Sequence, residues 1–263
     1  MIEFGICVLA VVPVRREPSN RAEMSTQLLF GDLMEVTARD GSWCQVKILY
    51  DGYEGWVDFR QVKLISEQEF SRLSQANVSV NRQLFSDFVV AGKTKIYLPA
   101  GCSFYDLKDK TMDISGEKYR LEGISYSFTF DGIESLLQTA FGYLSCPYLW
   151  GGKTYMGLDC SGFTQVVYKQ RGIKLLRDAA NQATQGGLIT SLSDIKPGDL
   201  AFFDNTEGKI VHVGILLDSQ RIIHSSGEVR IDTIDHQGIF NRDLNKYTHS
   251  LRLIKRVAED SRQ

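Results

Sequence analysis

The stretch PYLWGGKTYMGLDCSGF (Pro147–Phe163) predicts the start of a helix with a cysteine in its first turn. Asp159 is of a residue type that caps helix N-termini, and apolar residues recur after it at helical spacing until Gly172. Cys160 directly follows the cap, where unpaired backbone N–H groups and the helix dipole favour a thiolate. The glycines before Cys160 allow a sharp turn and leave space for a substrate backbone. A cysteine at a helix start is weak evidence alone, because a small buried side chain fits the same pattern.

Four histidines follow this helix, namely His212, His224, His236 and His249. His212 and His224 lie on neighbouring apolar runs, and a hairpin would place their rings side by side. His224 would then accept the proton on the far nitrogen of His212, while His212 acts as a base toward Cys160. Two core histidines with satisfied hydrogen bonds are one alternative, and a zinc site made of the same three residues is another. His236 and His249 have no motif around them and are expected to be surface or structural residues.

The composition describes a folded protein with balanced charge. The 263 residues suffice for two or three modules, and 43% apolar residues argue against disorder. The net charge of −2 gives no reason to expect nucleic acid or an anionic membrane as a partner. The five cysteines are odd in number and form no CxxC pair, which argues against a disulfide framework or a structural zinc site. Free thiols are typical of a reducing compartment.

The sequence of the first residues favours a β-strand over a targeting signal. The apolar run Ile6–Val14 is short and follows Glu3, where a signal peptide would carry basic residues. A β-strand is the favoured interpretation, because valine and isoleucine dominate the run. No apolar run approaches the roughly 18 residues of a membrane-spanning helix. We therefore expect a cytoplasmic protein, with export after removal of a leader as the alternative.

The first half of the chain shows short β runs separated by turn residues, which predicts small barrels. The first group of runs comprises Ile6–Val14, Leu33–Arg39, Trp43–Leu49 and Gly55–Asp58, with turns at Arg39–Gly41 and Asp51–Gly52. A second group extends from about Phe88 to Phe130, with turns at Pro99–Gly101 and Ser115–Gly116. The polar segment Ser66–Ser79 between the two groups is expected to be a helix or a linker.

The second half predicts helices followed by a sheet, which is an α+β domain. Apolar residues from Ile133 to Leu144 recur at helical spacing, and Asp131 is a suitable N-cap. The helix of Cys160 comes next. The predicted strands are Asp199–Asp204, Val211–Leu217, Arg221–Ser225, Val229–Thr233 and His249–Val257.

Four motifs in this half carry a resemblance to a known family. They are PYLWGGKTYMGLDCSGF (Pro147–Phe163), KPGDLAFF (Lys196–Phe203), HVGILL (His212–Leu217) and RIIHSS (Arg221–Ser226). In them the sequence resembles the NlpC/P60 family of cell-wall cysteine peptidases, over roughly Asp131 to Val257. The resemblance implies a papain-like catalytic domain at residues 131–263. It also implies roles for the site residues: Cys160 as nucleophile, His212 as general base, His224 as the group that orients it, Tyr148 at the oxyanion site, and Asp159 and Ser161 beside the nucleophile at the substrate.

The N-terminal half resembles bacterial SH3-like modules. The matching stretches are RAEMSTQLLFGDLMEV (Arg21–Val36) and DGYEGWVDF (Asp51–Phe59). We predict one SH3-like β-barrel at residues 1–65 and a second, weaker one at 80–130. Together with the catalytic domain, this order resembles the γ-D-glutamyl-L-diamino acid endopeptidases, also called dipeptidyl-peptidase VI. The resemblance implies hydrolysis of the γ-D-Glu–diamino acid bond in murein peptides with a free N-terminal L-Ala, releasing L-Ala-γ-D-Glu for cell-wall peptide recycling.

Such a substrate presents a free ammonium group, which needs carboxylates or other acceptors to replace its water. Asp178 matches the subgroup position that binds the ammonium, and Glu23 and Tyr53 are candidates for its other ligands. These three residues are called the clamp. Trp150 is a candidate for lining the pocket. The alternatives are a solvated surface charge for Glu23, barrel packing for Tyr53 and core packing for Trp150. Ala179 stands where the subgroup could place a hydroxyl, so one substrate hydrogen bond is in doubt.

Two further functions compete with the peptidase. One is a protein that binds cell wall or a partner and carries a degenerate catalytic domain. The other is an acyltransferase on the same fold. For the peptidase we expect no cofactor and no metal, murein-derived peptides (L-Ala-γ-D-Glu-diamino acid) as partners, no nucleic acid, no membrane, and a monomer.

Overall fold

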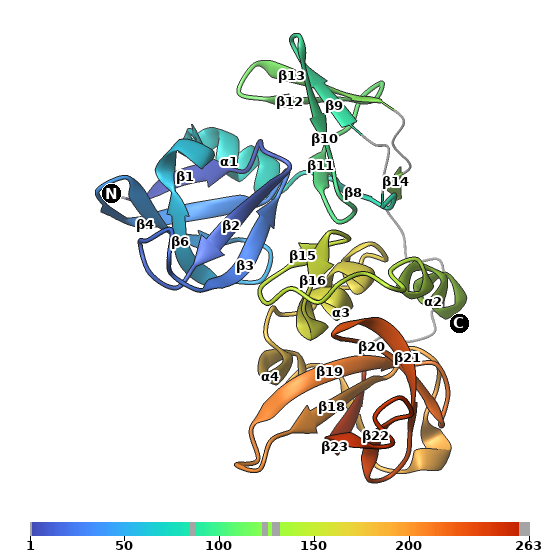
Figure 1. Cartoon of the computed structure of the whole chain (residues 1–263). Helices are drawn as coiled ribbons and strands as arrows, with labels where there is room; N and C mark the ends of the chain where they lie inside the picture. Colours follow the sequence, from blue (N-terminus) through green and yellow to red (C-terminus); the bar gives the residue numbers. More distant parts are fainter. Residues whose placement is uncertain (1, 85–87, 123–125, 128–131, 258–263) are drawn as a thin grey trace. The chain divides into compact units, whose positions relative to one another are not determined.

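Valine-rich sequence near the N-terminus forms strands, as its composition predicts. In β2 (Val11–Arg15), Val12 and Val14 are fully buried while the other three residues are partly exposed, as expected of a strand with one face on a core. The computed structural model describes residues 2–84, 88–122, 126–127 and 132–257. The chain divides into two compact units, a first unit of Met1–Thr129 with Trp150–Thr154 and a second unit of Phe130–Leu149 with Tyr155–Gln263 (Figure 1).

The first module of the first unit is a seven-stranded antiparallel sheet in the order β3-β2-β6-β5-β4-β1-β7, counted over the described residues. Its other strands are β1 (Glu3–Ile6), β3 (Met24–Leu29), β4 (Leu33–Asp40), β5 (Trp43–Ile48), β6 (Glu54–Asp58) and β7 (Lys63–Ile65), with a short 3-10 turn, η1, at Phe59–Gln61. Gly41 and Gly52 have φ of 56° and 73°, so glycine suits the two predicted turns. The sequence therefore locates these hairpins correctly.

The prediction of one strand over Ile6–Val14 was wrong. The structure breaks this run into β1 and β2, and the backbone of Cys7 bonds across to another loop instead of continuing a ladder. The Cys7 N–H donates to the Asp32 carbonyl at 2.9 Å, and the Gly31 N–H donates to the Cys7 carbonyl at 2.8 Å. An apolar run alone does not reveal such a break, because buried loop residues are as apolar as strand residues.

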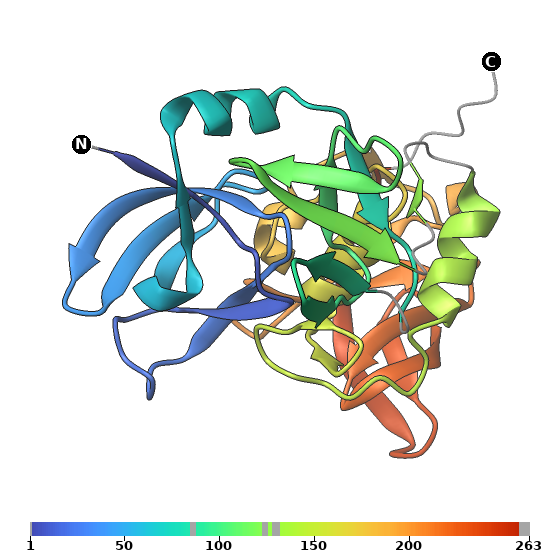
Figure 2. The same ribbon diagram turned by 90° about the horizontal axis from the view of Figure 1, so that it is seen from above.

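The polar segment after the first sheet forms helix α1 (Glu67–Ser74), as one of the two predicted possibilities. Ser66 caps it by accepting a hydrogen bond from the Glu69 N–H at 3.1 Å. In both ribbon views α1 lies along the first sheet (Figures 1 and 2), where Phe70 stacks on Phe4 with ring centroids 4.4 Å apart. This segment is thus packed against the first module.

The second module consists of two small antiparallel sheets, in the orders β10-β9-β13-β12 and β11-β8-β14. Their strands are β8 (Val78–Asn81), β9 (Phe88–Ala91), β10 (Thr94–Tyr97), β11 (Ser103–Tyr105), β12 (Thr111–Ile114), β13 (Glu117–Glu122) and β14 (Tyr126–Ser127). Gly101 and Gly116 have φ of 90° and 84° and lie in the two predicted turns.

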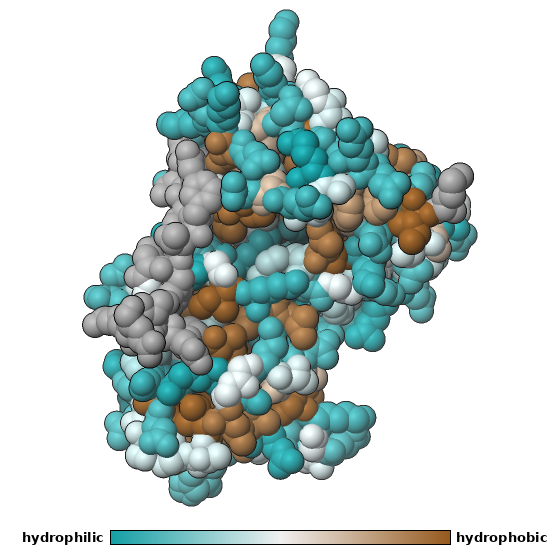
Figure 3. Space-filling view, turned by 180° about the vertical axis from the view of Figure 1, so that it is seen from behind, coloured by the Kyte–Doolittle hydropathy of each residue, from teal (hydrophilic) through white to brown (hydrophobic). Residues whose placement is uncertain are grey.

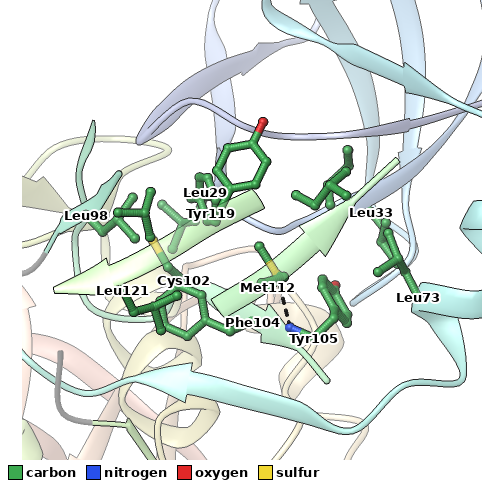
Figure 4. Packing of buried hydrophobic residues seen from close by; sticks show 14 of the residues in the cluster. Leu29, Leu33, Leu73, Leu98, Cys102, Phe104, Tyr105, Met112, Tyr119 and Leu121 are labelled. Atoms are coloured by element: carbon green, nitrogen blue, oxygen red, sulfur yellow. Dashed lines mark hydrogen bonds between the residues drawn. The ribbon is translucent and has the colours of Figure 1, made fainter. Parts of the chain in front are cut away.

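The two modules of the first unit share one hydrophobic core. Residues of the first sheet pack against residues of the second module in a single cluster (Figure 4), whose buried members include Leu29, Phe30, Leu33, Leu73, Leu98, Cys102, Phe104, Tyr105, Met112, Tyr119 and Leu121. The Phe30 and Tyr119 rings meet edge to face at 5.5 Å. The Tyr105 hydroxyl also donates to the Gly31 carbonyl at 2.7 Å. Since they share a core, the two modules are expected to unfold together.

The second unit begins with two of the predicted helices. Helix α2 (Ile133–Phe141) buries Leu136 and Ala140, but it ends before Leu144, which the spacing had included. The predicted cap Asp131 lies outside the described residues. Helix α3 (Cys160–Lys169) is buried along its whole length, and Asp159 caps it as predicted. The sequence did not predict the short helix α4 (Ala179–Gln182) or the 3-10 turn η2 (Leu192–Asp194).

An antiparallel sheet forms the rest of the second unit, in the order β17-β23-β18-β19-β20-β21-β22. Its strands are β17 (Gly187–Ile189), β18 (Leu200–Asp204), β19 (Ile210–Leu216), β20 (Arg221–Ser226), β21 (Glu228–Ile234), β22 (Gly238–Asn241) and β23 (Lys246–Arg256). Strand β23 pairs with β22 through its first half and with β18 through its second, so six strands form a closed ring. Helix α3 packs against β19 and β20. The α+β class predicted from the sequence is confirmed, and this packing brings the helix of Cys160 to the histidine strands.

Two short strands, β15 (Lys153–Thr154) and β16 (Gly157–Leu158), lie in the segment before Cys160.

Hydrophilic residues cover much of the face drawn in Figure 3, with hydrophobic residues between them. Large apolar side chains that remain exposed include Met156 and Trp150, at 75% and 54%. Scattered exposure of this kind is ordinary. None of the helices in the described ranges is long and apolar enough to cross a bilayer.

Candidate active site

Cys160 is the first residue of α3 and only 6% exposed. Burial raises the pKa of its thiol to about 12, and the negative charge of Asp159 acts in the same direction. The backbone N–H of Val213, the Arg177 guanidinium and the Ser161 N–H act in the opposite direction but do not outweigh burial. The prediction that the helix start lowers this pKa was therefore wrong in its net direction, because it ignored the loss of water around the sulfur.

The hairpin β19–β20 brings the two predicted histidines together. His212 Nε2 and His224 Nδ1 are 2.9 Å apart, and the rings stand nearly perpendicular. Both side chains are buried, with exposed fractions of 6% and 1%. Burial, then the charges of His224 and His249, hold the pKa of His212 well below its usual value. His212 is therefore a neutral imidazole at pH 7, which is the form able to accept a proton.

A carboxylate that the sequence reasoning missed lies behind the histidines. Asp232 on β21 is 5% exposed, and its Oδ2 lies 3.1 Å from His224 Nε2. Arg230 donates to both carboxylate oxygens of Asp232, at 2.9 and 3.0 Å. The available signal was the spacing of these two residues, because positions two apart in a strand share a face.

His249 was expected to be a surface or structural residue, yet it contacts the site. Its ring on β23 stacks on that of His212, with centroids 4.1 Å apart and an interplanar angle of 27°. The Thr248 hydroxyl lies 2.9 Å from His249 Nδ1. His249 thus covers one face of the His212 ring. His236, by contrast, is exposed.

A buried ion pair anchors the start of α3. Arg177 Nη1 and Nη2 lie 3.0 and 2.7 Å from the two carboxylate oxygens of Asp159, and Nη1 also donates to the Ser161 hydroxyl at 2.9 Å. Asp159 Oδ1 accepts from the Gly162 N–H at 2.7 Å as well. The structure brings Asp159 and Ser161 to the nucleophile, where both side chains contact Arg177. Their predicted contact with substrate stays a prediction.

Tyr148 is partly exposed in the segment that precedes the Cys160 helix. Burial raises the pKa of its hydroxyl, and the charges of Cys160 and Asp159 add to this effect. Asp178 is exposed at the start of α4, and Ala179 is buried directly after it.

Three of the predicted substrate residues belong to the first unit. Trp150 Nε1 donates to Glu23 Oε1 at 2.5 Å, and Arg16 Nε lies 3.0 Å from Glu23 Oε2. Glu23 is therefore held between two side chains, and Trp150 is exposed rather than part of a core. Tyr53 packs partly buried against the core of the first module. This packing agrees with the alternative interpretation of Tyr53.

The geometry of the two histidines bears on the zinc alternative. In the described part of the chain, no three histidine, cysteine or acidic side chains are placed to bind one metal ion. The ring nitrogens of His212 and His224 face each other instead of a shared point.

Comparison with known proteins gives two family matches. Residues 145–248 match the NlpC/P60 family, and residues 14–61 match the bacterial dipeptidyl-peptidase Sh3 domain. The chain is 32% identical to a γ-D-glutamyl-L-lysine dipeptidyl-peptidase of Bacillus subtilis over 217 residues, which cover 77% of this chain and 72% of the relative. It is 27% identical to dipeptidyl-peptidase 6 of Lysinibacillus sphaericus, covering 91% of this chain and 95% of that one.

A solved structure supports the fold. The crystal structure of an NlpC/P60 family protein from Bacillus cereus superimposes with a TM-score of 0.79 at 18% identity, over 97% of this chain and 99% of that chain. The papain-like catalytic fold with an N-terminal SH3-like region, expected from the motifs, is thereby confirmed. The identity and coverage of the Bacillus subtilis relative, together with the motif around Cys160, show that the chain belongs to the NlpC/P60 family.

Proposed function

We propose that this protein is a cysteine peptidase that hydrolyses the γ-D-Glu–diamino acid bond of murein peptides with a free N-terminal L-Ala. The observation that carries the proposal is the buried site in which a helix-start cysteine packs on the strands of two hydrogen-bonded histidines. The name of the similar γ-D-glutamyl-L-lysine dipeptidyl-peptidase supports cleavage at this bond, and both relatives' names support release of a dipeptide.

In the proposed mechanism, neutral His212 removes the proton of Cys160 as the sulfur attacks the carbonyl carbon of the γ-glutamyl bond. This order of steps agrees with a thiol that is protonated at rest. Because the pKa of the thiol is raised, a base is needed to remove its proton. The Tyr148 hydroxyl stabilises the oxyanion of the tetrahedral intermediate. His212 then returns the proton to the leaving amine, and water hydrolyses the thioester by the same route.

Specificity for a free N-terminus requires acceptors for an ammonium group. Glu23, Tyr53 and Asp178 remain our proposed ligands of that group. Glu23 is already oriented by Trp150, which limits the side-chain entropy lost when a ligand binds. Asp159, Ser161 and Trp150 remain proposed substrate-binding residues.

The test is hydrolysis of L-Ala-γ-D-Glu-diaminopimelate and of its lysine analogue, followed by detection of the released diamino acid. We expect cleavage of the free peptide, resistance of the N-acetylated peptide, and no cleavage by Cys160→Ala. Equal cleavage of free and acetylated peptides would refute the free-amine specificity. Unchanged cleavage by Cys160→Ala would refute the role of Cys160 as nucleophile, and no cleavage by the wild-type protein would favour a binding protein with a degenerate domain.

A matched pair of variants tests the clamp. Glu23→Gln should raise the KM for the free peptide, whereas Glu54→Gln, which changes an exposed carboxylate of the same module, should not. Incubation with amine acceptors tests the acyltransferase alternative, because transfer would yield a new amide instead of free L-Ala-γ-D-Glu.

We also propose that the protein acts as a cytoplasmic monomer. All five cysteines are free and buried, which agrees with a reducing compartment. Cell fractionation and gel filtration test the two parts of this proposal. Recovery of the protein outside the cytoplasm would refute the first part, and elution as a dimer would refute the second.

A further inference from the structure

The hydrogen bonds of the site continue beyond the two histidines to a carboxylate on the next strand. His212 Nε2 meets His224 Nδ1 at 2.9 Å, and His224 Nε2 meets Asp232 Oδ2 at 3.1 Å. The exposed fractions of the three side chains are 6%, 1% and 5%. The line of contacts is therefore shielded from water, and each ring proton must be placed by its neighbours.

Only one assignment of these protons satisfies both contacts when Asp232 is ionised. A carboxylate can only accept, so His224 carries its proton on Nε2. The other nitrogen of His224 is then an acceptor, which requires the proton of His212 to lie on Nε2. Nδ1 of His212 is left as the basic nitrogen. Asp232 thus determines the tautomer of a ring that it does not touch.

Asp232 is itself held ionised and oriented. Burial acts to raise its pKa, but the hydrogen bonds from His224 and Arg230 outweigh burial and hold the pKa below its usual range. Arg230 binds both oxygens, and its own charge is balanced by Asp243 at 2.7 Å. Arg230 lies directly opposite His224 in the β20–β21 pairing, and Asp232 follows two residues later on the same face.

We propose that Asp232, held by Arg230, is a positioning residue that fixes the tautomers of His224 and His212 and stabilises the imidazolium formed when His212 takes up a proton. A buried carboxylate behind a catalytic imidazole acts in this way in other hydrolases. The proposal rests on the proposed function only in its catalytic part. The assignment of tautomers depends on the hydrogen bonds and on the ionised state of Asp232, and not on the substrate.

The charged and titratable groups around the histidines come from four elements. They are Cys160 on α3, Arg230 and Asp232 on β21, His249 on β23, and Asp243 in the turn between β22 and β23, which pairs with Arg230. Among them Asp232 is the carboxylate in direct contact with an imidazole. Removing its charge should lower the pKa of the imidazolium, so the acidic limb of the kcat/KM profile should move to lower pH while the plateau falls.

The first experiment uses the wild-type chain labelled with 15N-histidine. The chain has four histidines, so a multiple-bond proton–nitrogen correlation spectrum is readily assigned by replacing His236 and His249 in turn. We expect both His212 and His224 as Nε2–H tautomers at neutral pH. A His224 ring protonated on Nδ1 would overturn the proposal, whatever the substrate of the protein is.

The second experiment compares Asp232→Asn with Asp243→Asn. Both remove one carboxylate partner of Arg230, but only Asp232 touches His224. For Asp232→Asn we expect a mixture of His224 tautomers, a fall in kcat of about 10-fold or more on the murein peptide, and an acidic limb displaced to lower pH. For Asp243→Asn we expect values within about twofold of wild type, since its side chain is 74% exposed.

The outcomes separate this inference from the proposed function. If the expected tautomers are found but no murein peptide is cleaved, the proposed function fails and the positioning role stands. If the peptide is cleaved and Asp232→Asn retains wild-type kcat, pH profile and tautomers, the positioning role is refuted. Should Asp232→Asn fail to fold, the wild-type spectrum alone still decides the tautomer assignment.

Discussion

Replacement of Arg177 by methionine should destabilise the second unit strongly. The guanidinium and the carboxylate of Asp159 form a pair with side-chain exposures of 1% and 7%, and the guanidinium also donates to the Ser161 hydroxyl. Arg177→Met leaves the carboxylate buried without its cation. Breaking a buried pair in this way costs about 3–5 kcal/mol. At about 2–4 °C per kcal/mol for 150–250 residues, the Tm should fall by about 6–20 °C.

Differential scanning calorimetry measures this shift, and two further variants interpret it. Arg221→Met removes the cation of an exposed pair with Asp218, whose side chains are 61% and 38% exposed, and should cost about 0–1 kcal/mol. The double variant Arg177→Met with Asp159→Asn removes both buried charges and keeps a residue that caps helices well. It should therefore recover part of the loss.

Two results would refute this reasoning. One is a Tm of Arg177→Met that falls no further than that of Arg221→Met. The other is a double variant as unstable as the single one, because the loss would then come from packing of the arginine stem and not from an unpaired charge.

Three other predictions concern single residues. Burial raises the pKa of Cys160 to about 12, so the rate of its alkylation by iodoacetamide should rise about tenfold per pH unit between pH 7 and 9. An alkylation rate that does not change between pH 5 and 9 would contradict a protonated thiol in the resting protein. Burial, followed by the charge of His224, lowers the pKa of His249 to about 4, so the unfolded chain binds a proton between pH 6.5 and 4 that the folded chain does not. Stability should fall as the pH drops through this window, by about 2 kcal/mol at pH 5, and urea unfolding of His249→Phe should show a smaller pH-dependent loss than wild type. Gly31→Ala places a Cβ against the Ser103 carbonyl oxygen, whereas Gly41→Ala, also at positive φ, meets no atom within 4 Å. Thermal unfolding should therefore find the first variant less stable than the second by about 1–3 kcal/mol, and equal stabilities would refute the close approach.

The parts of the site that the sequence predicts are those that local signals specify. Asp159 caps the helix of Cys160 because its type and its position before an apolar run determine that role. His212 and His224 become neighbours because two short strands joined by a tight turn must pair.

The missed residues depend on contacts that local patterns do not encode. In the sequence, Arg230 and Asp232 look like a solvated charge pair on a strand. They lie beside His224 because their strand, β21, is the neighbour of β20 in the sheet. His249 reaches His212 because β23 closes the ring of strands, which is a long-range pairing. The net direction of the pKa shift of Cys160 depends on burial, which a helix start alone does not reveal.

The β19–β20–β21 arrangement also has a consequence for how the enzyme acquires activity during folding. His212, His224 and Asp232 lie on three successive strands that pair as consecutive hairpins, so their mutual contacts close only short loops. Cys160, by contrast, must dock from a helix far earlier in the chain. We therefore expect the contacts among His212, His224 and Asp232 to form before the helix of Cys160 packs on these strands. A partly folded chain would be inactive until that long-range packing forms.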